Sequence, residues 1–312
     1  MARFYRKKLL LSKLESTSAY GVDTVPVGTT NAILTRDLTI EVMQGDTVQR
    51  NSDRPTLGGE LTYHVAPHTR MSFMVEAAAA GTAGDAPAYG PLLRACGLGE
   101  TISAGTDVTY APVSSGFESV SSYFSMDGIR HISLGQRGTV RLTLGPGSIP
   151  YFNFQMTGLR TAPTDTADPT PDFTDFQTPL PVTDSNTPTF TLDGYAANLY
   201  ELELDLSNNV IYRNIVGQES VEITDRGVTG TLTIEEPLLA TKNFHAICAA
   251  HTTVAMQYIH GTAAGGIIQI DCPHVQLLQP TIGERDGVAT LSFQLSVIPS
   301  ASGNDEVTIK VK

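Results

Sequence analysis

The sequence predicts a mainly β protein with short helices, organised as two similar domains. Short runs that alternate apolar and polar residues lie on both sides of residues 161–190, which is typical of half-buried strands. Charged residues make up only 17% of the 312-residue chain, and its 28 glycines and 18 prolines favour turn-rich β structure over helix bundles. Several short motifs occur twice in the same order, which indicates an internal duplication.

Changes in composition suggest the domain boundaries. Residues 161–190 are rich in Pro, Thr and Asp and have neither a helical nor a strand period, as expected of a linker. The first residues of the chain are basic and aromatic. We therefore expect an N-terminal assembly arm at 1–30, a first β domain at 31–160, the linker at 161–190 and a second β domain at 191–312.

The repeated motifs resemble strands and keep their order in both domains. The matched pairs are Leu38–Ile40 with Leu202–Leu204, Val48–Asn51 with Ile211–Asn214, Phe73–Glu76 with Leu232–Glu235, Val140–Leu142 with Val275–Leu277, and Phe154–Met156 with Phe293–Leu295. Divergent loop lengths would explain why the offset between the domains varies. The alternative is two unrelated β-rich domains that share only the alternation common to half-buried strands.

One helix is expected at the same place in each domain. The first covers Tyr89–Cys96, with Pro91 near its start and Gly97 just after its end. The second covers Leu238–His251 and follows Pro237. The side chains that these helices are expected to bury in the core are Leu92, Leu93, Cys96, Phe244, Ile247 and Cys248.

Charge and cysteine content exclude several classes of protein. The formal charge of −12 argues against a duplex-binding surface, because such binding needs clustered Lys and Arg. Three cysteines are an odd number and suggest no disulfide framework. There is no export signal and no apolar run near the roughly 20 residues of a membrane span. We expect synthesis in the cytoplasm and no contact with a membrane.

Catalytic and cofactor signatures are missing from the sequence, so we expect neither an enzyme nor a cofactor. There is no GxSxG, P-loop, HExxH or GxGxxG motif in a suitable context. Gly145–Gly147 is interpreted as a turn between strands. His245, Cys248 and His251, with Cys272 further on, could suggest zinc. Their helical spacing spreads them around the helix, so a buried thiol is the preferred interpretation.

Two charged segments are candidate functional surfaces. No Lys or Arg occurs from Thr161 to Tyr212, where alternation places Glu201, Glu203 and Asp205 on one face of a strand. That face is either an ordinary solvated surface or a wall that repels DNA. The basic N-terminal residues either form a free tail or dock onto the acidic face of a neighbouring copy. These basic residues are Arg3, Arg6, Lys7, Lys8 and Lys13.

Several extended segments carry a family likeness. Leu11–Asp23 with Asn31–Leu34, Ala88–Gly97 and Tyr110–Ser114 resemble the major tail tube proteins of bacteriophages with long non-contractile tails, and of related prophages. The likeness runs over nearly the whole chain and rests on several extended matches rather than on one diagnostic motif.

The resemblance implies a β-sandwich or barrel-like tube domain with a flanking helix, and a structural role in the virion tail. Subunit sheets would join edge to edge into rings, and the rings would stack into a hollow tube through which DNA leaves the particle. Because similar rings hold six tube domains, two domains per chain imply homotrimeric rings with pseudo-six-fold symmetry. Simple hexamers remain the alternative. The other implied partners are the tape measure, tail terminator and distal tail proteins, with DNA passing transiently.

The resemblance also gives the charged segments expected roles. Arg3–Lys13 would be an arm between rings, and Gln44–Val65 a stacking hairpin. The acidic residues expected to face the lumen are Asp37, Glu41, Glu201, Glu203 and Asp205. The alternative function is a β-rich virion adhesin or decoration module, which would display a ligand-binding patch and occur in few copies per particle.

Overall fold

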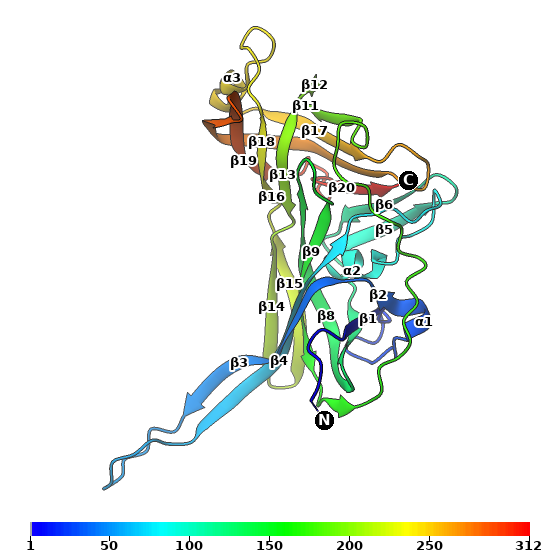
Figure 1. Cartoon of the computed structure of the whole chain (residues 1–312). Helices are drawn as coiled ribbons and strands as arrows, with labels where there is room; N and C mark the ends of the chain where they lie inside the picture. Colours follow the sequence, from blue (N-terminus) through cyan, green and yellow to red (C-terminus); the bar gives the residue numbers. More distant parts are fainter. Residues whose placement is uncertain (1) are drawn as a thin grey trace.

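The computed structural model describes residues 2–312 as an elongated, mostly β molecule (Figure 1). The strands of the first half are β1 (Lys8–Leu14), β2 (Ala32–Ile33), β3 (Arg36–Gln49), β4 (Thr62–Glu76), β5 (Leu98–Ser103), β6 (Asp107–Pro112), β7 (Val120–Met126), β8 (Ile129–Leu144) and β9 (Tyr151–Arg160). The short β10 (Thr164–Asp165) follows, and the three helices of residues 2–312 are α1 (Gly28–Asn31), α2 (Gly90–Ala95) and α3 (Phe244–Ala249).

The second half is built from ten further strands among the described residues. They are β11 (Thr189–Leu192), β12 (Tyr195–Ala196), β13 (Leu199–Asp205), β14 (Asn208–Ile215), β15 (Gln218–Arg226), β16 (Thr229–Glu235), β17 (Thr253–His260), β18 (Ile268–Arg285), β19 (Val288–Val297) and β20 (Thr308–Val311). The expectation of a β-rich protein with short helices is therefore confirmed.

Strands pair in the same order in both halves. In the first half the antiparallel order is β1–β7–β8–β9–β4–β3, with β2 on β1. In the second half it is β11–β17–β18–β19–β16–β13, with β12 on β11. Helices α2 and α3 follow corresponding strands, β4 and β16. The halves differ in the β5–β6 hairpin of the first and the separate β14–β15 hairpin of the second.

The two halves are joined at two places. Strand β13 pairs with the last residues of β8, so the two sheets continue into one another. Strand β20, near the C-terminus, pairs with β18 of the second half and with β6 of the first. The two halves therefore share one continuous hydrogen-bonded sheet and are not joined by a linker alone.

The core lies on one face of this continuous sheet. Alternation along β4, β9, β16 and β19 places Phe73, Phe154, Leu232 and Phe293 inward, each at most 4% exposed. The rings of Phe73 and Phe154 stack at 5.5 Å between centroids. Each such side chain contributes about 1.5–3 kcal/mol by leaving water. One hydrophobic cluster runs through both halves, which explains why the sheet keeps its register.

The first helix matches its prediction, and the second is shorter than expected. Helix α2 has Pro91 in its first turn and is followed by Gly97, whose φ of 79° is in the left-handed region. In the second half, Leu238–Thr241 forms a turn instead of helix. The helix begins only after Asn243, whose side-chain oxygen accepts a hydrogen bond from the Ala246 N–H because an N-cap satisfies a free helical amide.

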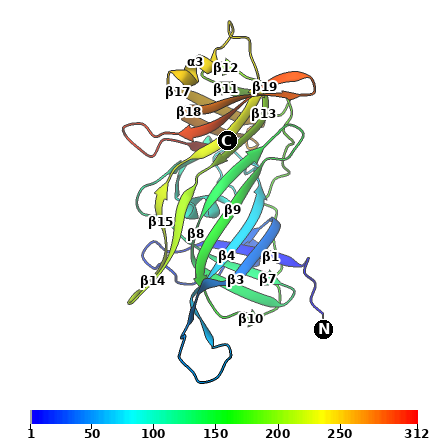
Figure 2. The same cartoon turned by 90° about the vertical axis from the view of Figure 1, so that its left-hand side faces the viewer.

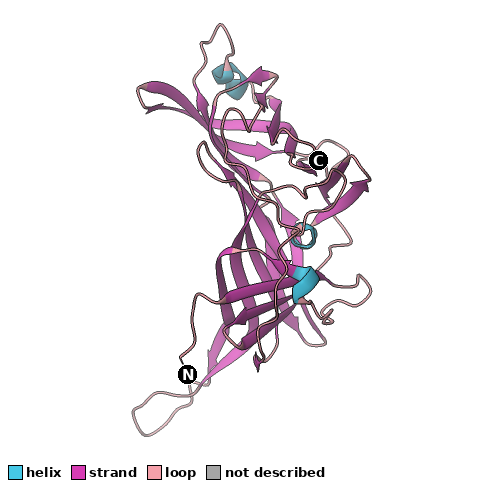
Figure 3. Cartoon of the chain, turned by 45° about the vertical axis from the view of Figure 1, so that its right-hand side comes forward, coloured by secondary structure: helices cyan, strands magenta, loops and turns pink. Residues whose placement is uncertain are grey.

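Residues 161–190 form a strap rather than a free linker. It is the green chain that runs along the right-hand side of the molecule in Figure 1, and most of it is drawn as loop in Figure 3. Val182 is only 4% exposed, and its backbone N–H and C=O pair with Ser148 and Gly147 at 2.8 Å each. Asp172 donates its backbone N–H to Gly28. The Pro-rich composition that predicted a linker also suits an extended segment held by packing.

Candidate functional site: the assembly surfaces

The joint between the halves is a short antiparallel ladder. Its opposed residues are Leu144 and Leu202, Thr143 and Glu203, Leu142 and Leu204, and Arg141 and Asp205. Arg141 lies 2.8 Å from Glu203 and 3.0 Å from Asp205, so its guanidinium ties β8 to β13. Leu142 and Leu204 are each 5% exposed on the other face. The joint thus has an apolar side and a charged side.

Two strand edges remain open at the ends of this continuous sheet. Strand β3 has β4 on one side and, within residues 2–312, no strand on the other. Along residues 277–285, β18 has β19 on one side and again no second neighbour in the described chain. Ile282 on this edge is 63% exposed and Val42 on β3 is 39% exposed. Open edges that carry apolar side chains favour pairing with another strand.

The acidic residues predicted to face the lumen lie on the uncovered face of the sheet. Glu201, Glu203 and Asp205 alternate with buried leucines along β13. Asp37 and Asp205 line the same shallow groove, which also includes Arg141, so the first-half and second-half residues share a face. Helix α2 lies behind β8 and β9 in Figure 2, and no helix crosses the sheet face toward the viewer.

Basic residues partly neutralise this acidic face. Arg141 pairs with both Glu203 and Asp205, and Arg36 lies 3.4 Å from Asp37. Glu41 is exposed on β3 and accepts a hydrogen bond from Gln44. The net negative charge of this face is therefore smaller than the sequence alone indicated. These arginines could not be assigned to the face in advance, because their spacing in the sequence does not show which acidic residues they lie beside.

The predicted arm is largely part of the fold. Lys8 and Lys13 belong to β1, which pairs along its length with β7 and buries Leu10 and Leu11. This corrects the expectation of an arm over residues 1–30: among the described residues, only 2–7 precede the first strand. The apolar run Leu9–Leu11 within β1 was readable in the sequence, but the basic residues around it favoured a tail.

Residues 2–7 also contact their own chain. Arg3 donates to the Met126 carbonyl at 2.8 Å, and Lys7 lies 3.2 Å from Asp127. The pKa of Asp127 is lowered, first by the hydrogen bond from the Phe4 N–H and then by Lys7. Arg6 is exposed. Exposed pairs of this kind are weak because water screens them, so these residues can exchange their partners for those of a neighbour.

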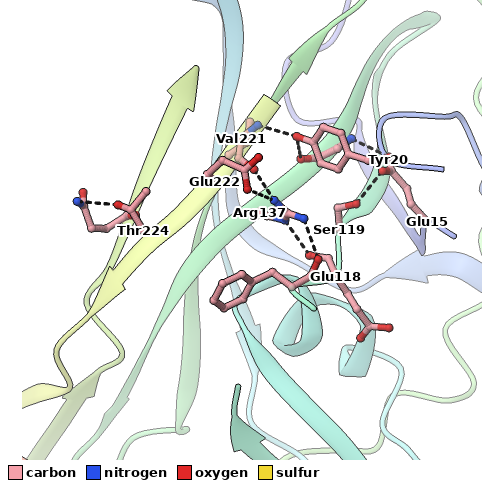
Figure 4. Close-up of polar contacts among 11 residues, drawn as sticks. Glu15, Tyr20, Glu118, Ser119, Arg137, Val221, Glu222 and Thr224 are labelled. Carbon is pink, nitrogen blue, oxygen red and sulfur yellow. Dashed lines mark hydrogen bonds and ion pairs between the residues drawn. The ribbon is translucent and has the colours of Figure 1, made fainter. Parts of the chain in front are cut away.

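A buried polar network, not predicted from the sequence, fastens the β14–β15 hairpin onto the first half (Figure 4). Arg137 donates to the Val221 carbonyl and to Glu222, both at 2.7 Å, and to the Phe117 carbonyl at 2.8 Å. Tyr20 accepts from the Val221 N–H at 2.7 Å. Burial raises the pKa of Tyr20 to about 12, so its hydroxyl stays protonated and donates to Gly135.

Glu15 extends this network into the N-terminal segment. Its carboxylate accepts from the Gly135 and Gly21 N–H groups at 2.6 and 2.8 Å, and from the Ser119 and Ser121 hydroxyls at 2.7 and 2.9 Å. Four donors satisfy a carboxylate that is only 5% exposed. The network therefore holds three distant segments of the chain in fixed positions.

The predicted helix-core residues divide by depth. Leu92, Leu93 and Cys96 are fully buried and Phe244 is 1% exposed, whereas Ile247 and Cys248 are partly buried against the core. Burial raises the pKa of the Cys272 thiol to about 12. His245 lies against Glu236. Among residues 2–312, no three His, Cys, Asp or Glu side chains gather as a metal site requires.

Comparison with known proteins gives one family. No curated protein sequence matches the chain, and no helix within the described residues is long and apolar enough to cross a membrane. The family model described as phage tail tube protein matches residues 7–301, which include both halves and the strap between them. By this match, the chain belongs to the phage tail tube protein family, a family of structural virion proteins.

Proposed function

We propose that three copies of this chain close into a pseudo-six-fold ring, and that these rings stack into the tube of a long non-contractile tail. The proposal includes an internal duplication, in which each half supplies one tube domain. Family membership supports the tail-tube role. The observation that carries the ring is the equal pairing order of the two halves, together with the β8–β13 joint that already links two such units edge to edge.

The open edges support closure of the ring. One chain presents β3 at one end of its continuous sheet and β18 at the other, so every copy offers two different edges. Contacts between two different edges are heterologous. Such contacts build a closed ring when the rotation from one copy to the next is a whole fraction of a full turn. Three copies of a two-unit chain give the six tube domains expected of the ring.

The acid-rich uncovered face is proposed to line the lumen. Glu201, Glu203 and Asp205 project from one side of β13, opposite the core. A negatively charged wall repels DNA phosphates and keeps the genome from binding as it passes. The arginine pairs on this face reduce the net charge, and the Thr and Ser residues of β16 and β19 add neutral polar surface.

Stacking is proposed to use the long β3–β4 hairpin, which projects away from the body of the molecule (Figure 1). Between Gln44 and Val65 this hairpin exposes several apolar side chains, which suits contact with another copy. They are Val48, Leu57, Leu61, Tyr63 and Val65. Residues 2–7 would add a basic contact to the acidic surface of an adjacent ring. Tape measure, terminator and distal tail proteins are the proposed partners along and at the ends of the tube.

Electron microscopy of the concentrated protein, with native mass spectrometry of its rings, tests the proposal. Hollow tubes with three chains per ring would support the tail-tube role and the pseudo-six-fold ring together. Rings of six chains would keep the tube and remove the trimer. A protein that stays monomeric at all concentrations, and is scarce in the virion, would overturn the tube role and favour an adhesin or decoration module.

A further inference from the structure

We infer that neighbouring copies join through an antiparallel ladder between β18 of one copy and β3 of the next, in the register of the internal β8–β13 joint. Thr281 then lies opposite Glu41, and Ile282 opposite Ile40, of the adjacent copy. The inference rests on the proposed ring and goes further, because it fixes which residues meet. The internal joint provides the template for this contact.

Rows of opposed residues across each sheet show which positions of β8 and β18 correspond. A row is a set of residues that lie opposite one another on four neighbouring strands. One such row crosses β8, β9, β4 and β3 in the first half, and its equivalent crosses β18, β19, β16 and β13 in the second. It consists of Arg141, Asn153, Met74 and Arg36 in the first half, and of Thr281, Ser292, Thr233 and Glu201 in the second. Thr281 on β18 therefore takes the place that Arg141 has on β8.

A second pair of rows relates β3 to β13. These rows are Glu41, Arg70, Thr157 and Arg137 in the first half, and Asp205, Thr229, Ser296 and Gln276 in the second. Glu41 therefore takes the place of Asp205. Because Arg141 lies opposite Asp205 in the internal joint, Thr281 is expected opposite Glu41 in the joint between copies.

Apolar side chains keep their positions in this alignment but differ in exposure. Leu142, Leu204 and Leu206 cover one another in the internal joint, where each is 5% exposed. Their counterparts on the open edges are Ile282, Ile40 and Val42, all apolar. Ile282 is 63% exposed and Val42 is 39% exposed. Leu144 is the exception among the buried residues of the internal joint, because its counterpart on β18 is Glu284. The other three counterparts are apolar, and a second copy would bury them in the same way.

The bulge in β18 is compatible with this ladder. At the equivalent place in β8, Val140 joins the contact through its carbonyl, which accepts from the Leu206 N–H at 3.1 Å. In β18 the register shifts between Leu278 and Thr281, where Gln279 and Pro280 replace one ladder residue. Proline has no N–H to donate but keeps its carbonyl, so it is tolerated at a position that only accepts.

Disulfide trapping tests the register. The variant combines Thr281→Cys with Glu41→Cys and carries Cys248→Ser to remove the partly exposed native thiol. After tubes form under reducing conditions, mild oxidation should yield covalent dimers and trimers on denaturing gels, since opposed strand residues meet disulfide distances. The matched control pairs Thr281→Cys with Arg36→Cys, which lies on the same strand and face but in another row. We expect at least about five-fold less cross-linking in the control.

The outcomes separate the register from the tube itself. Strong cross-linking only for the Thr281–Glu41 pair supports the ladder. Tubes that form normally but cross-link in neither variant, or equally in both, would overturn the register while the tail-tube role stands. If the unmodified chain forms no rings or tubes at any concentration, the ring fails, and the ladder fails with it.

Discussion

Replacing Arg137 is expected to loosen the attachment of the β14–β15 hairpin. Arg137→Met keeps the aliphatic stem but removes the guanidinium, which is 11% exposed and donates to the carbonyls of Phe117, Val221 and Glu118 at 2.8, 2.7 and 3.3 Å. The change leaves Glu222 without its partner and those carbonyls unsatisfied. Breaking a buried pair costs about 3–5 kcal/mol. Since the Glu222 side chain is 30% exposed and can be hydrated, we expect about 3 kcal/mol.

Urea denaturation of the unassembled chain measures this loss. For a slope of about 3 kcal/mol per molar, a loss of about 3 kcal/mol moves the midpoint by about 1 M. The control is Arg54→Met, because Arg54 also pairs with a glutamate, Glu60 at 3.1 Å, but is 52% exposed. Exposed pairs contribute about 0–1 kcal/mol. Equal midpoint shifts for the two variants would refute the assignment of Arg137 as a buried anchor.

Three further outcomes follow from the charged face, a buried histidine and the cysteines. Glu201→Lys adds positive charge to the proposed lumen without touching the Arg141 pairs, so tails should assemble while genome ejection slows; ejection at the normal rate would contradict the lumen assignment. Burial lowers the pKa of His260 below its ordinary 6.5, and its ring is held by the Leu180 carbonyl and the Thr187 hydroxyl. The folded state therefore favours the neutral ring, so stability present above about pH 6.5 should fall as the pH drops below it. The urea midpoint of His260→Gln should change less with pH over this range than that of the unmodified chain. Of the three cysteines, Cys96 and Cys272 are buried and Cys248 is partly exposed, so a thiol reagent should modify one cysteine in the native chain and three in denaturant.

Much of the strand pattern could be predicted from the sequence, because alternation is a local property. The matches of Phe73 with Leu232 and of Phe154 with Phe293 agree with the rows of opposed residues in the two sheets. Leu38 lies in the irregular stretch of β3 between Arg36 and Thr39 and has no opposed residue on β4, so the rows do not test its match with Leu202. The match of Val140 with Val275 is wrong. Val140 lies opposite Phe154, but Val275 lies opposite Val297 rather than Phe293. Bulges at different places in β8 and β18 shift the register, and a bulge leaves little trace in hydrophobic alternation.

The polar anchors could not be predicted, because they join residues far apart in the chain. Arg137 and Glu222 are 85 positions apart, and Glu15 and Gly135 are 120 apart. Nothing in the local sequence distinguishes a buried Arg from a surface Arg, since both interrupt an apolar pattern in the same way. The length of the second helix was also overestimated. Pro237 suggested a start near Leu238, but the helix begins only after its N-cap at Asn243.

The two joints of the proposed ring differ in strength, and this difference bears on when the ring forms. The internal ladder has Arg141 between Glu203 and Asp205, and the chain itself keeps its strands at high effective concentration. At the matching place between copies, Thr281 provides no charge for Glu41, and the bulge at Pro280 shortens the open edge. Features of this kind discourage indiscriminate pairing of edge strands. We therefore expect each copy to keep its own two units joined, and closure of the proposed ring to depend on the additional contacts that a growing tube supplies.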